Sequence, residues 1–208
     1  MATPLYPQGS SALLLIDPYN DFLSDGGKLH KFAKAVADAT GTVAHMKAVV
    51  DAVRAAGHPV FVVPHHRALP SDFSGWRHPS PYLLASHRAQ PFALGSWGGE
   101  WHPDFVPRPE DIVVREHWAS SGFANTDLDL QLKSRGIERL ILIGLLANTC
   151  VETTAKFGAE LGYHVPLVRD ATAAFSPDAM RAAHEINGPT YAHEILTSEA
   201  VIAALAHR

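Results

Sequence analysis

The chain has 208 residues, of which 47% are hydrophobic and 18% are charged, and its formal net charge is -4. This is the composition of a globular domain, and without a Lys/Arg block it argues against nucleic acid or an anionic membrane as a partner. No apolar run approaches the roughly 20 residues of a membrane span, and we recognise no signal peptide. The single cysteine, Cys150, rules out an intrachain disulfide. We therefore expect one domain over residues 1–208, located in the cytoplasm.

Short apolar runs alternate with helical patterns along the chain. In order, we predict a strand at residues 11–17, a helix at 32–56 that Gly41 could divide, strands at 60–63 and 112–114, a helix at 125–135, a strand at 140–143, a helix at 150–161, a strand at 164–168, a helix at 177–186, a strand at 194–196 and a last helix at 199–207. Strands that alternate with helices at this spacing are typical of right-handed βαβ units. We therefore predict an α/β fold with a mainly parallel sheet of about six strands and helices on both faces.

The longest segment without a clear helix or strand pattern, residues 65–109, is rich in Pro, Ser and Gly. It holds three of the four tryptophans, Trp76, Trp97 and Trp101, and its aromatic content argues against disorder. A loop region of this length in a compact domain is usually functional. We predict that it forms a lid or a binding wall on the substrate side of the domain.

Polar side chains with catalytic potential fall at the carboxyl ends of the predicted strands. They are Asp17, His65, His117, Cys150 and Asp170. In open parallel sheets these ends share one edge, and ligands bind there. We therefore expect the functional site at this edge, with Asp170 as a helix cap or loop anchor rather than a catalytic group.

Cys150 lies where a predicted strand turns into a helix. Backbone N–H groups at a helix N-terminus favour an anion, so we expect the pKa of this thiol to lie below that of a free cysteine. Thiol attack on a carbonyl needs a base or a cation, and the backbone N–H groups of residues 146–150 are the obvious donors for the resulting oxyanion. The alternative for a lone cysteine is a small buried apolar residue.

Four segments of the chain together resemble the isochorismatase-like cysteine hydrolases. They are LLLIDPYNDF, GEWHPDF, SGFANTDLDLQL and LILIGLLANTCVETTAKFGAELGYHVPLVRDATAA. The resemblance covers nearly the whole chain and implies a doubly wound, three-layer α/β/α sandwich. The family includes nicotinamidases, carbamoylsarcosine-type amidohydrolases, ureidoacrylate amidohydrolases and true isochorismatases, and its usual triad is Asp, Lys and Cys.

The resemblance also implies roles for individual residues. By position, Asp17 matches the aspartate that deprotonates the thiol, and Cys150 matches the nucleophile. A non-proline cis peptide is expected at Leu145–Leu146, just before the cysteine turn. The N–H groups of Leu146 and Cys150 would then form the oxyanion hole.

The third triad position departs from the family pattern, because His117 stands where the family has lysine, and Arg115 is the nearest fixed cation. A protonated His117 could help to hold a thiolate, whereas neutral imidazole supplies no charge. Alternatively, His117 accepts the proton and Asp17 orients it, as in Cys-His-Asp chemistry. The remaining interpretation is a hydrogen-bonded histidine that lines the pocket.

A metal is the other interpretation of the many histidines. Nicotinamidases of this family bind a divalent ion through an Asp-x-His pair after strand two and two more histidines. Here the matching residues are Pro64, His65 and His66, so the aspartate is missing. Neighbouring side chains on an extended segment also point to opposite sides. We therefore expect no metal and no cofactor.

We expect a small-molecule substrate that contacts side chains from several loops. The candidates are His65, Trp97, Trp118, Asn20 and Phe22. The tryptophans, together with Trp101, favour a flat or aromatic substrate. Asn20 could instead fix the loop after the first strand through side-chain to backbone bonds. By analogy with the family, the chain is expected to form a homodimer or homotetramer.

Together these residues predict a hydrolase that cleaves a C–N bond of a small amide, lactam or ureido substrate through a thioester at Cys150. One alternative is vinyl-ether cleavage of an isochorismate-type substrate, which needs acid chemistry and no thiol, so the presence of Cys150 argues against it. The other is a non-catalytic or redox-responsive protein on the same fold.

Overall fold

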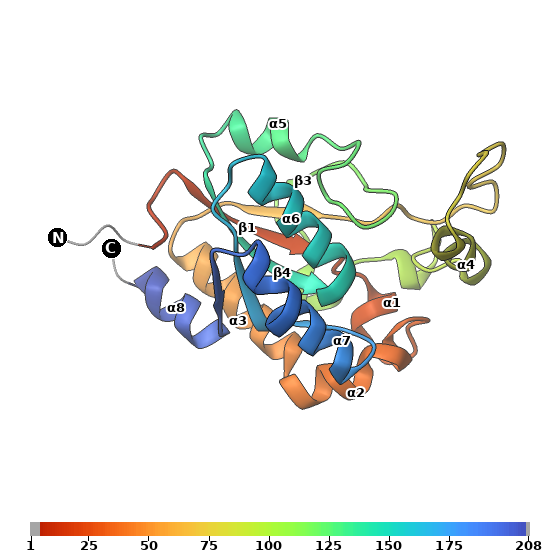
Figure 1. The fold of residues 1–208 in the computed structure, drawn as a ribbon, viewed down its shortest axis with the longest axis horizontal. Coiled ribbons are helices and arrows are strands. Elements are labelled where there is room, and N and C mark those ends of the chain that lie inside the picture. Colours follow the sequence, from red (N-terminus) through yellow and green to blue (C-terminus); the bar gives the residue numbers. More distant parts are fainter. Residues whose placement is uncertain (1–4, 207–208) are drawn as a thin grey trace.

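A sheet of six strands forms the centre of the domain (Figure 1). The computed structural model describes residues 5–206. Its strands lie in the order β3-β2-β1-β4-β5-β6, and every neighbouring pair is parallel. Their bounds are β1 (Ser11–Ile16), β2 (Val60–Val63), β3 (Ile112–Val113), β4 (Arg139–Leu145), β5 (Pro166–Ala173) and β6 (Glu194–Leu196). The predicted α/β fold with a parallel sheet is therefore confirmed.

Helices cover both faces of the sheet and complete the three layers. One face packs against α2 (His30–Thr40), α3 (Thr42–Ala55) and α8 (Ser198–Ala206), and the other against α5 (Leu128–Lys133) and α6 (Glu152–Glu160). Alternate residues of β1 serve the two faces: Leu13 and Leu15 belong to the first cluster, Leu14 and Ile16 to the second. Because both faces are covered, this strand is a continuous apolar run, as parallel strands usually are.

Two glycines occupy backbone positions where a residue with a side chain would be strained. Gly41 ends α2 in the left-handed conformation, with φ 65°, and α3 begins at the next residue, so the predicted division is confirmed. Gly144 of β4 has φ 122°, and a Cβ atom there would lie 2.1 Å from the carbonyl oxygen of Ile16. Only glycine therefore lets β4 and β1 approach so closely at the edge where β1 ends.

Residues 65–109, here called the wall segment, contain a helix where we predicted loop. Helix α4 (Pro81–Ala89) begins after Ser80, whose Oγ accepts a hydrogen bond from the Leu83 N–H at 3.2 Å. Pro81 occupies the first turn, where its missing N–H is not needed. None of the helix's residues is buried, so it lacks the apolar stripe that makes a helix visible in sequence. In Figure 1, α4 projects beyond the sheet at the end opposite the termini.

The other departures concern the ends of elements. β5 extends to Ala173, so Asp170 lies inside the strand rather than after it, which corrects the predicted boundary. Asp170 accepts hydrogen bonds from the N–H and Oγ of Ser198 at 2.7 and 2.8 Å, and so caps α8, in agreement with its expected role as a cap. The predicted end of the last helix, at residue 207, lies outside the described residues.

Shorter turns connect these elements. They are α1 (Asn20–Leu23), η1 (Trp97–Gly99), η2 (Pro103–Phe105), η3 (Ala147–Val151), α7 (Pro177–Arg181), η4 (Ala182–Asn187) and η5 (Gly188–Thr190). Of these, η3 matters most for function, because it is a single π-helical turn that contains Cys150. Turns of this kind occur frequently at functional sites.

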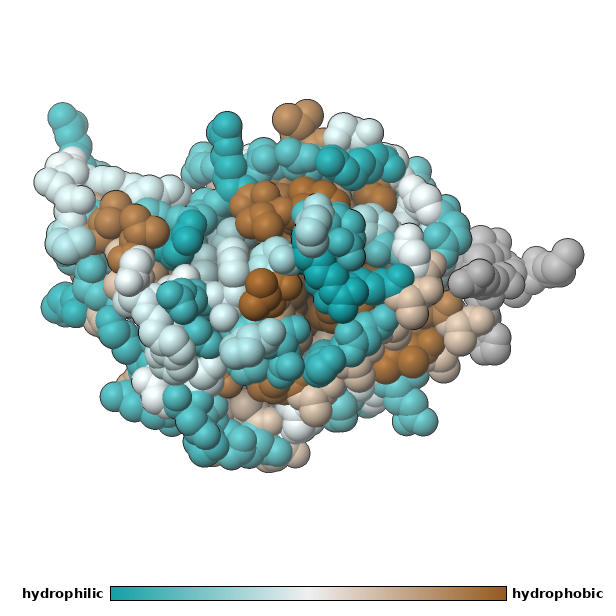
Figure 2. Space-filling view, turned by 180° about the vertical axis from the view of Figure 1, so that it is seen from behind, coloured by the Kyte–Doolittle hydropathy of each residue, from teal (hydrophilic) through white to brown (hydrophobic). Residues whose placement is uncertain are grey.

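The surface is mixed in character. Within residues 5–206, no helix combines the length and the apolar character needed to cross a membrane. On the face shown in Figure 2, hydrophobic residues form separate patches among hydrophilic ones. Large apolar side chains that are more than half exposed include Phe32, Leu94, Val106, Leu130 and Ile186. Scattered exposed apolar residues are normal on a folded domain, and the cores lie on the two sides of the sheet.

Candidate active site

Three of the predicted strand-end residues meet at the C-terminal edge of the sheet. Asp17 follows β1, His117 follows β3, and Cys150 lies in η3 directly after β4. A carboxylate oxygen, an imidazole nitrogen and the thiol sulfur lie within 4.8 Å of one another. The three residues are 0%, 0% and 2% exposed. We call this group the Asp17–His117–Cys150 cluster. The fold thus brings together the residues that the sequence singled out.

Asp17 is held in an unusual position. Its backbone lies in the left-handed region, with φ 52°, which is sparsely populated for residues other than glycine. Its Oδ1 is 3.0 Å from Nε2 of His117. An ionised carboxylate can only accept a hydrogen bond, so Nε2 carries the proton when Asp17 is ionised. Among the described residues, Oδ2 of Asp17 and Nδ1 of His117 are buried and have no hydrogen-bond partner. One carboxylate oxygen is therefore free to act on the thiol.

The pKa of the Cys150 thiol is raised well above its ordinary value. Burial is the main cause, and the negative charge of Asp17 adds to it. The Thr149 hydroxyl donates toward the sulfur at 3.8 Å, and the sulfur donates toward the Ala119 carbonyl at 3.9 Å. The prediction of a lowered pKa was therefore wrong, because the start of a helix does not outweigh burial beside a carboxylate. The resting thiol therefore keeps its proton at neutral pH and would need a base to act as a nucleophile.

The turn before the cysteine has the predicted backbone form. The Leu145–Leu146 peptide bond is cis. The backbone of Leu146 favours the Cys150 thiolate and so partly offsets the raised pKa of the thiol. The N–H groups of Thr149 and Val151 donate to the Leu146 carbonyl at 3.2 and 3.1 Å, which holds the turn closed. A backbone donor thus lies beside the sulfur, where the predicted oxyanion hole needs one.

The third position of the cluster belongs to His117 rather than Arg115. Arg115 is exposed, and its backbone N–H donates to Asp127 at 2.7 Å, away from the cluster. The ion-pair partner of Asp17 among the described residues is His117. No lysine or arginine from residues 5–206 pairs with Asp17. A positive charge paired with this carboxylate therefore requires protonation of the His117 imidazole.

Comparison with known proteins identifies the family to which this site belongs. The isochorismatase domain family matches residues 11–199. The chain belongs to the isochorismatase family. The ureidoacrylate amidohydrolase RutB of Rhizobium rhizogenes is 31% identical over 189 residues, which cover 85% of this chain and 76% of the relative. The RutB protein of Variovorax paradoxus is 32% identical and covers 87% of this chain and 75% of the relative.

Similar solved structures agree with this assignment. A cysteine hydrolase from Pseudomonas syringae pv. phaseolicola superposes with a TM-score of 0.80 at 25% identity and covers 99% of both chains. The N-carbamoylsarcosine amidase from Thermoplasma acidophilum gives a TM-score of 0.66 at 29% identity, over 91% of this chain and 97% of that one. The predicted family is confirmed, and with it the prediction of a hydrolase that cleaves C–N bonds.

The histidine pair after β2 does not fit the metal site known from some members of the isochorismatase family. Pro64 stands where those members have aspartate. Nδ1 of His65 is 2.9 Å from the His66 carbonyl. Both ring nitrogens of His66 face carboxylates, with Nε2 3.0 Å from Asp72 and Nδ1 3.3 Å from Glu116. These nitrogens are already engaged in protein contacts, so we derive no reaction step through a metal at this place.

His65 nevertheless lies beside the Asp17–His117–Cys150 cluster. Its ring centroid is 5.1 Å from that of His117 and 5.4 Å from that of Phe92. Burial lowers its pKa below the ordinary value for histidine, which makes the ring neutral at physiological pH. Its predicted contact with substrate stays a prediction, and its position is compatible with it.

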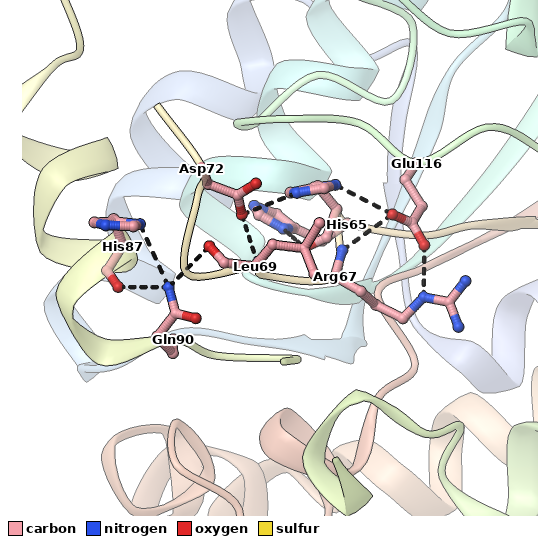
Figure 3. A network of polar contacts seen from close by, with 8 residues as sticks. His65, Arg67, Leu69, Asp72, His87, Gln90 and Glu116 are labelled. Atoms are coloured by element: carbon pink, nitrogen blue, oxygen red, sulfur yellow. Dashed lines mark hydrogen bonds and ion pairs between the residues drawn. The ribbon is translucent and has the colours of Figure 1, made fainter. Parts of the chain in front are cut away.

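His66 belongs to a set of ion pairs that attaches the wall segment to the domain. Figure 3 labels three other members of this set, Arg67, Asp72 and Glu116. Besides the two carboxylates that face His66, Nε of Arg67 donates to Glu116 at 2.6 Å. The Trp118 ring stacks on the His66 ring with centroids 3.8 Å apart. We call His66, Arg67, Asp72 and Glu116 the wall network. Because Glu116 and Trp118 flank His117, this network fixes the wall segment next to the cluster.

The wall network shifts the pKa values of its members in opposite directions. Burial alone would lower the pKa of His66, but hydrogen bonds to Glu116 and Asp72 raise it above its ordinary value. Burial alone would raise the pKa of Glu116, but hydrogen bonds from His66 and Arg67 lower it to about 2. When it is protonated, the His66 imidazolium lies between two carboxylates and holds this part of the structure together.

Two residues predicted to bind substrate point into the protein instead. The side chain of Asn20 donates to the Trp97 carbonyl at 2.9 Å and accepts from the Ser24 hydroxyl at 2.8 Å. Phe22 is 4% exposed and packs against Phe92 with ring centroids 4.9 Å apart. Asn20 therefore fixes the loop after β1, as the alternative interpretation had it. The predicted contact of Asn20 and Phe22 with substrate stays a prediction.

The predicted tryptophans have different settings. Trp101 stacks on Tyr19 with centroids 4.9 Å apart and packs against the core. Trp97 is half exposed on η1. Trp118 lies in an aromatic group with Phe73 and Trp76, at centroid distances of 6.1 and 5.7 Å. Of the tryptophans, Trp118 is thus the one that follows directly on a cluster residue and can line the pocket.

Sequence reasoning missed one residue of the wall segment that faces the cluster. Tyr82 lies in the first turn of α4. Tyr82 is half exposed, but partial desolvation raises the pKa of its phenol, and the charges of Cys150 and Asp17 raise it further, so the phenol lies within electrostatic reach of both. No sequence motif marks Tyr82. Because helix α4 was not predicted, the direction of the Tyr82 side chain could not be predicted either.

Proposed function

We propose that this chain is a cysteine-dependent amidohydrolase that cleaves a C–N bond of a small amide or ureido substrate through a thioester at Cys150. The observation that carries the proposal is the buried Asp17–His117–Cys150 cluster, in which one oxygen of Asp17 is free. A thiol of raised pKa next to a free carboxylate oxygen suits a base-assisted attack, because the proton has an acceptor in reach as the sulfur bonds to carbon.

The first half-reaction forms the thioester. Oδ2 of Asp17 takes the thiol proton while the sulfur bonds to the carbonyl carbon, and the carbonyl electron pair moves onto the oxygen. The N–H groups of Leu146 and Cys150 hold this oxyanion. A donor of this kind typically lowers the free-energy barrier by about 2.7–4 kcal/mol. The oxyanion then collapses, the C–N bond breaks, and the proton on Asp17 passes to the leaving nitrogen.

The second half-reaction releases the acid. Water gives a proton to Asp17 as it attacks the thioester carbonyl, and the same backbone donors hold the second oxyanion. When the C–S bond breaks, the thiolate takes the proton from Asp17, which returns the cluster to its resting form. His117 keeps its Nε2–H on Oδ1 throughout, so that Oδ2 is the oxygen that exchanges the proton.

The substrate class follows from the walls of the site and from the relatives. Two similar proteins are named for ureidoacrylate and N-carbamoylsarcosine, which are small acids with a ureido group. The neutral ring of His65, the indole of Trp118 and the phenol of Tyr82 supply flat faces and hydrogen-bonding groups around the cluster. We therefore propose a small, largely planar amide or ureido acid as substrate.

Trapping of the acyl-enzyme tests this proposal. The purified chain is mixed with a panel of small amides and ureido acids, quenched in acid after milliseconds to seconds, and its intact mass is measured. We expect one added acyl group, located on Cys150 by peptide mapping, and no adduct on the Cys150→Ser variant. Turnover by Cys150→Ala at the wild-type rate would contradict the thioester and favour vinyl-ether or other acid chemistry.

The predicted location and assembly also stay proposals. We propose a cytoplasmic homodimer or homotetramer that binds neither nucleic acid nor membrane, supported by a net charge of -4 and by apolar side chains exposed on several elements. Light scattering coupled to size-exclusion chromatography measures the assembly, and a monomer at micromolar concentration would contradict it. Cell fractionation measures the location.

A further inference from the structure

The Asp17–His117–Cys150 cluster has a second chemical property besides nucleophilic attack. It presents one carboxylate oxygen, one imidazole nitrogen and one sulfur within 4.8 Å of one another, all of them buried. Oxygen, nitrogen and thiolate sulfur are the three donor types that Zn²⁺ accepts. Mg²⁺ and Ca²⁺ prefer oxygen donors alone, so this donor set selects a softer ion.

The spacing of the donors suits a zinc ion after small movements. Zinc-to-ligand bonds of about 2.0–2.3 Å in a tetrahedron place the ligand atoms roughly 3.5 Å apart. The carboxylate and imidazole of Asp17 and His117 are now 3.0 Å apart, and the most distant donors of the cluster are no more than 4.8 Å apart. Shifts of about 1 Å would therefore bring all three onto one ion.

Two polar atoms of the cluster independently indicate that it can take a ligand. Oδ2 of Asp17 and Nδ1 of His117 are buried, and within residues 5–206 neither has a hydrogen-bond partner. Both residues are 0% exposed, so these are polar atoms enclosed with the sulfur rather than atoms at the surface. Buried polar atoms without a protein partner are rare and need an explanation such as a bound ion or water.

The charge of the cluster points the same way. The ion-pair partner of Asp17 among the described residues is an imidazole, and neither lysine nor arginine pairs with it there. When the thiol and the carboxylate are both ionised, the cluster carries two negative charges with at most one positive charge. A divalent cation balances these charges. As it binds, the thiol proton leaves to water and the proton on Nε2 of a neutral His117 moves to Nδ1, which leaves Nε2 free to bind the ion.

From this geometry we infer that the Asp17–His117–Cys150 cluster binds one Zn²⁺ ion, with water as the fourth ligand, and that the ion acts as a reversible inhibitor rather than as a cofactor. The bound ion draws charge from the sulfur and makes it a weaker nucleophile, and it lies between the sulfur and Asp17, so the thiol proton can no longer pass to the carboxylate. The inhibition rests on the proposed function, whereas the binding does not.

Titration with Zn²⁺ against a chromophoric chelator tests the binding. The chelator-treated chain should take up one ion that Mg²⁺ does not displace. We expect Cys150→Ser, Asp17→Asn and His117→Ala each to weaken binding at least about 10-fold, because loss of a ligand costs no less than loss of an outer partner. The matched control is His193→Ala. His193 lies next to His164, with ring centroids 4.5 Å apart, so these two rings are a place outside the cluster where an ion could bind.

Co²⁺ provides a readout that does not depend on activity. A cobalt–thiolate bond gives a charge-transfer absorption in the near ultraviolet, which should appear in the wild type and in His193→Ala and be lost in Cys150→Ser. Circular dichroism of each variant shows whether it is folded. The inference is overturned if the three cluster variants bind as the wild type does, or if His193→Ala is the variant that loses the ion.

Activity separates failure of this inference from failure of the proposed function. We expect Zn²⁺ to abolish amide hydrolysis and added chelator to restore it. Hydrolysis that is unaffected at saturating Zn²⁺ would leave the amidohydrolase in place and overturn the inhibition. One bound ion at the cluster in a chain that hydrolyses none of the amides would leave the zinc site in place and contradict the proposed function.

Discussion

The cluster and the wall segment meet at the same edge of the sheet but are built in different ways. Asp17, His117 and Cys150 are buried and are positioned by the backbone, through strand ends, a left-handed residue and a cis peptide. Residues 65–90 of the wall segment include no buried residue and are held by the wall network and the aromatic contacts of Trp118, whereas Phe92 and Phe105 anchor the rest of the segment in the core. Helix α4 has no buried residue.

This difference separates the parts of the site by their tolerance to change. The buried cluster residues tolerate little change in position, because movement of one strand end disturbs the packing of the whole sheet. A wall held by a few ion pairs can change its residues without disturbing the core, as surface loops on rigid scaffolds generally can. We therefore expect cluster variants to lose turnover, and wall variants to change substrate affinity.

The largest effect is expected for Cys150→Ala. Removal of the nucleophile should lower kcat/KM at least about 10³-fold, because the covalent route is lost while the pocket remains. Steady-state hydrolysis of the best substrate measures this, with His193→Ala as a folded control of unchanged activity. A loss of less than about tenfold would remove the cysteine from the mechanism.

Asp17→Asn should lower kcat by about 10²–10⁴-fold, the usual contribution of a general base. The same change should speed alkylation of Cys150, because the charge of Asp17 helps to raise the pKa of the thiol. Below its pKa, each unit by which the pKa falls gives about tenfold more thiolate. Iodoacetamide rates between pH 7 and 10, measured by intact mass with chelator present, test this. Unchanged alkylation would mean that Asp17 does not act on the sulfur.

Substitutions at His117 should separate its roles. His117→Ala is expected to lower kcat about 10²-fold, because Asp17 loses the donor on Oδ1. If positive charge is what matters, His117→Lys restores part of the loss. If the hydrogen bond alone matters, His117→Gln does so. Wild-type rates from the alanine variant would show that the histidine only lines the pocket.

The smallest effect is expected in the wall network, and it depends on pH. The folded pKa of His66 is raised above 6.5, so its ion pairs are fully present below pH 6.5 and are lost as the pH rises through the raised value. The folded pKa of Glu116 is lowered from 4.5 to about 2, so its contribution is present above pH 4.5 and is lost as the pH falls toward 2. The network is therefore most stable between these limits.

Hydrogen exchange of residues 65–90 measures this window. We expect exchange to speed up above the pKa of His66, and KM to rise by a few-fold, the effect of losing about 1 kcal/mol. His66→Gln should exchange quickly at every pH and remove the alkaline transition. Lys47→Ala, which breaks the exposed pair with Asp51, is the control and should change neither quantity. A flat pH profile in the wild type would show that His66 does not hold the wall.

Much of the fold and the cluster was predictable because the relevant signals are local. Runs such as SALLLI and RLILIGL are apolar on both faces, as buried parallel strands are, and polar residues directly after them must share one edge. Asp17 and His117, 100 positions apart, could therefore be paired through topology alone. The capping signals at Ser80 and Pro81 were also local, but α4 has no apolar stripe and went unrecognised.

What the sequence by itself determined is the parallel sheet and the three residues, Asp17, His117 and Cys150, that meet at the C-terminal edge of its strands. Only the tertiary structure decided the state of the thiol, the inward direction of Asn20 and Phe22, and the pairing of His66 with two carboxylates. The physical reason is that strand periodicity is a property of adjacent residues. A pKa or an ion pair depends instead on burial and on distances between atoms far apart along the chain.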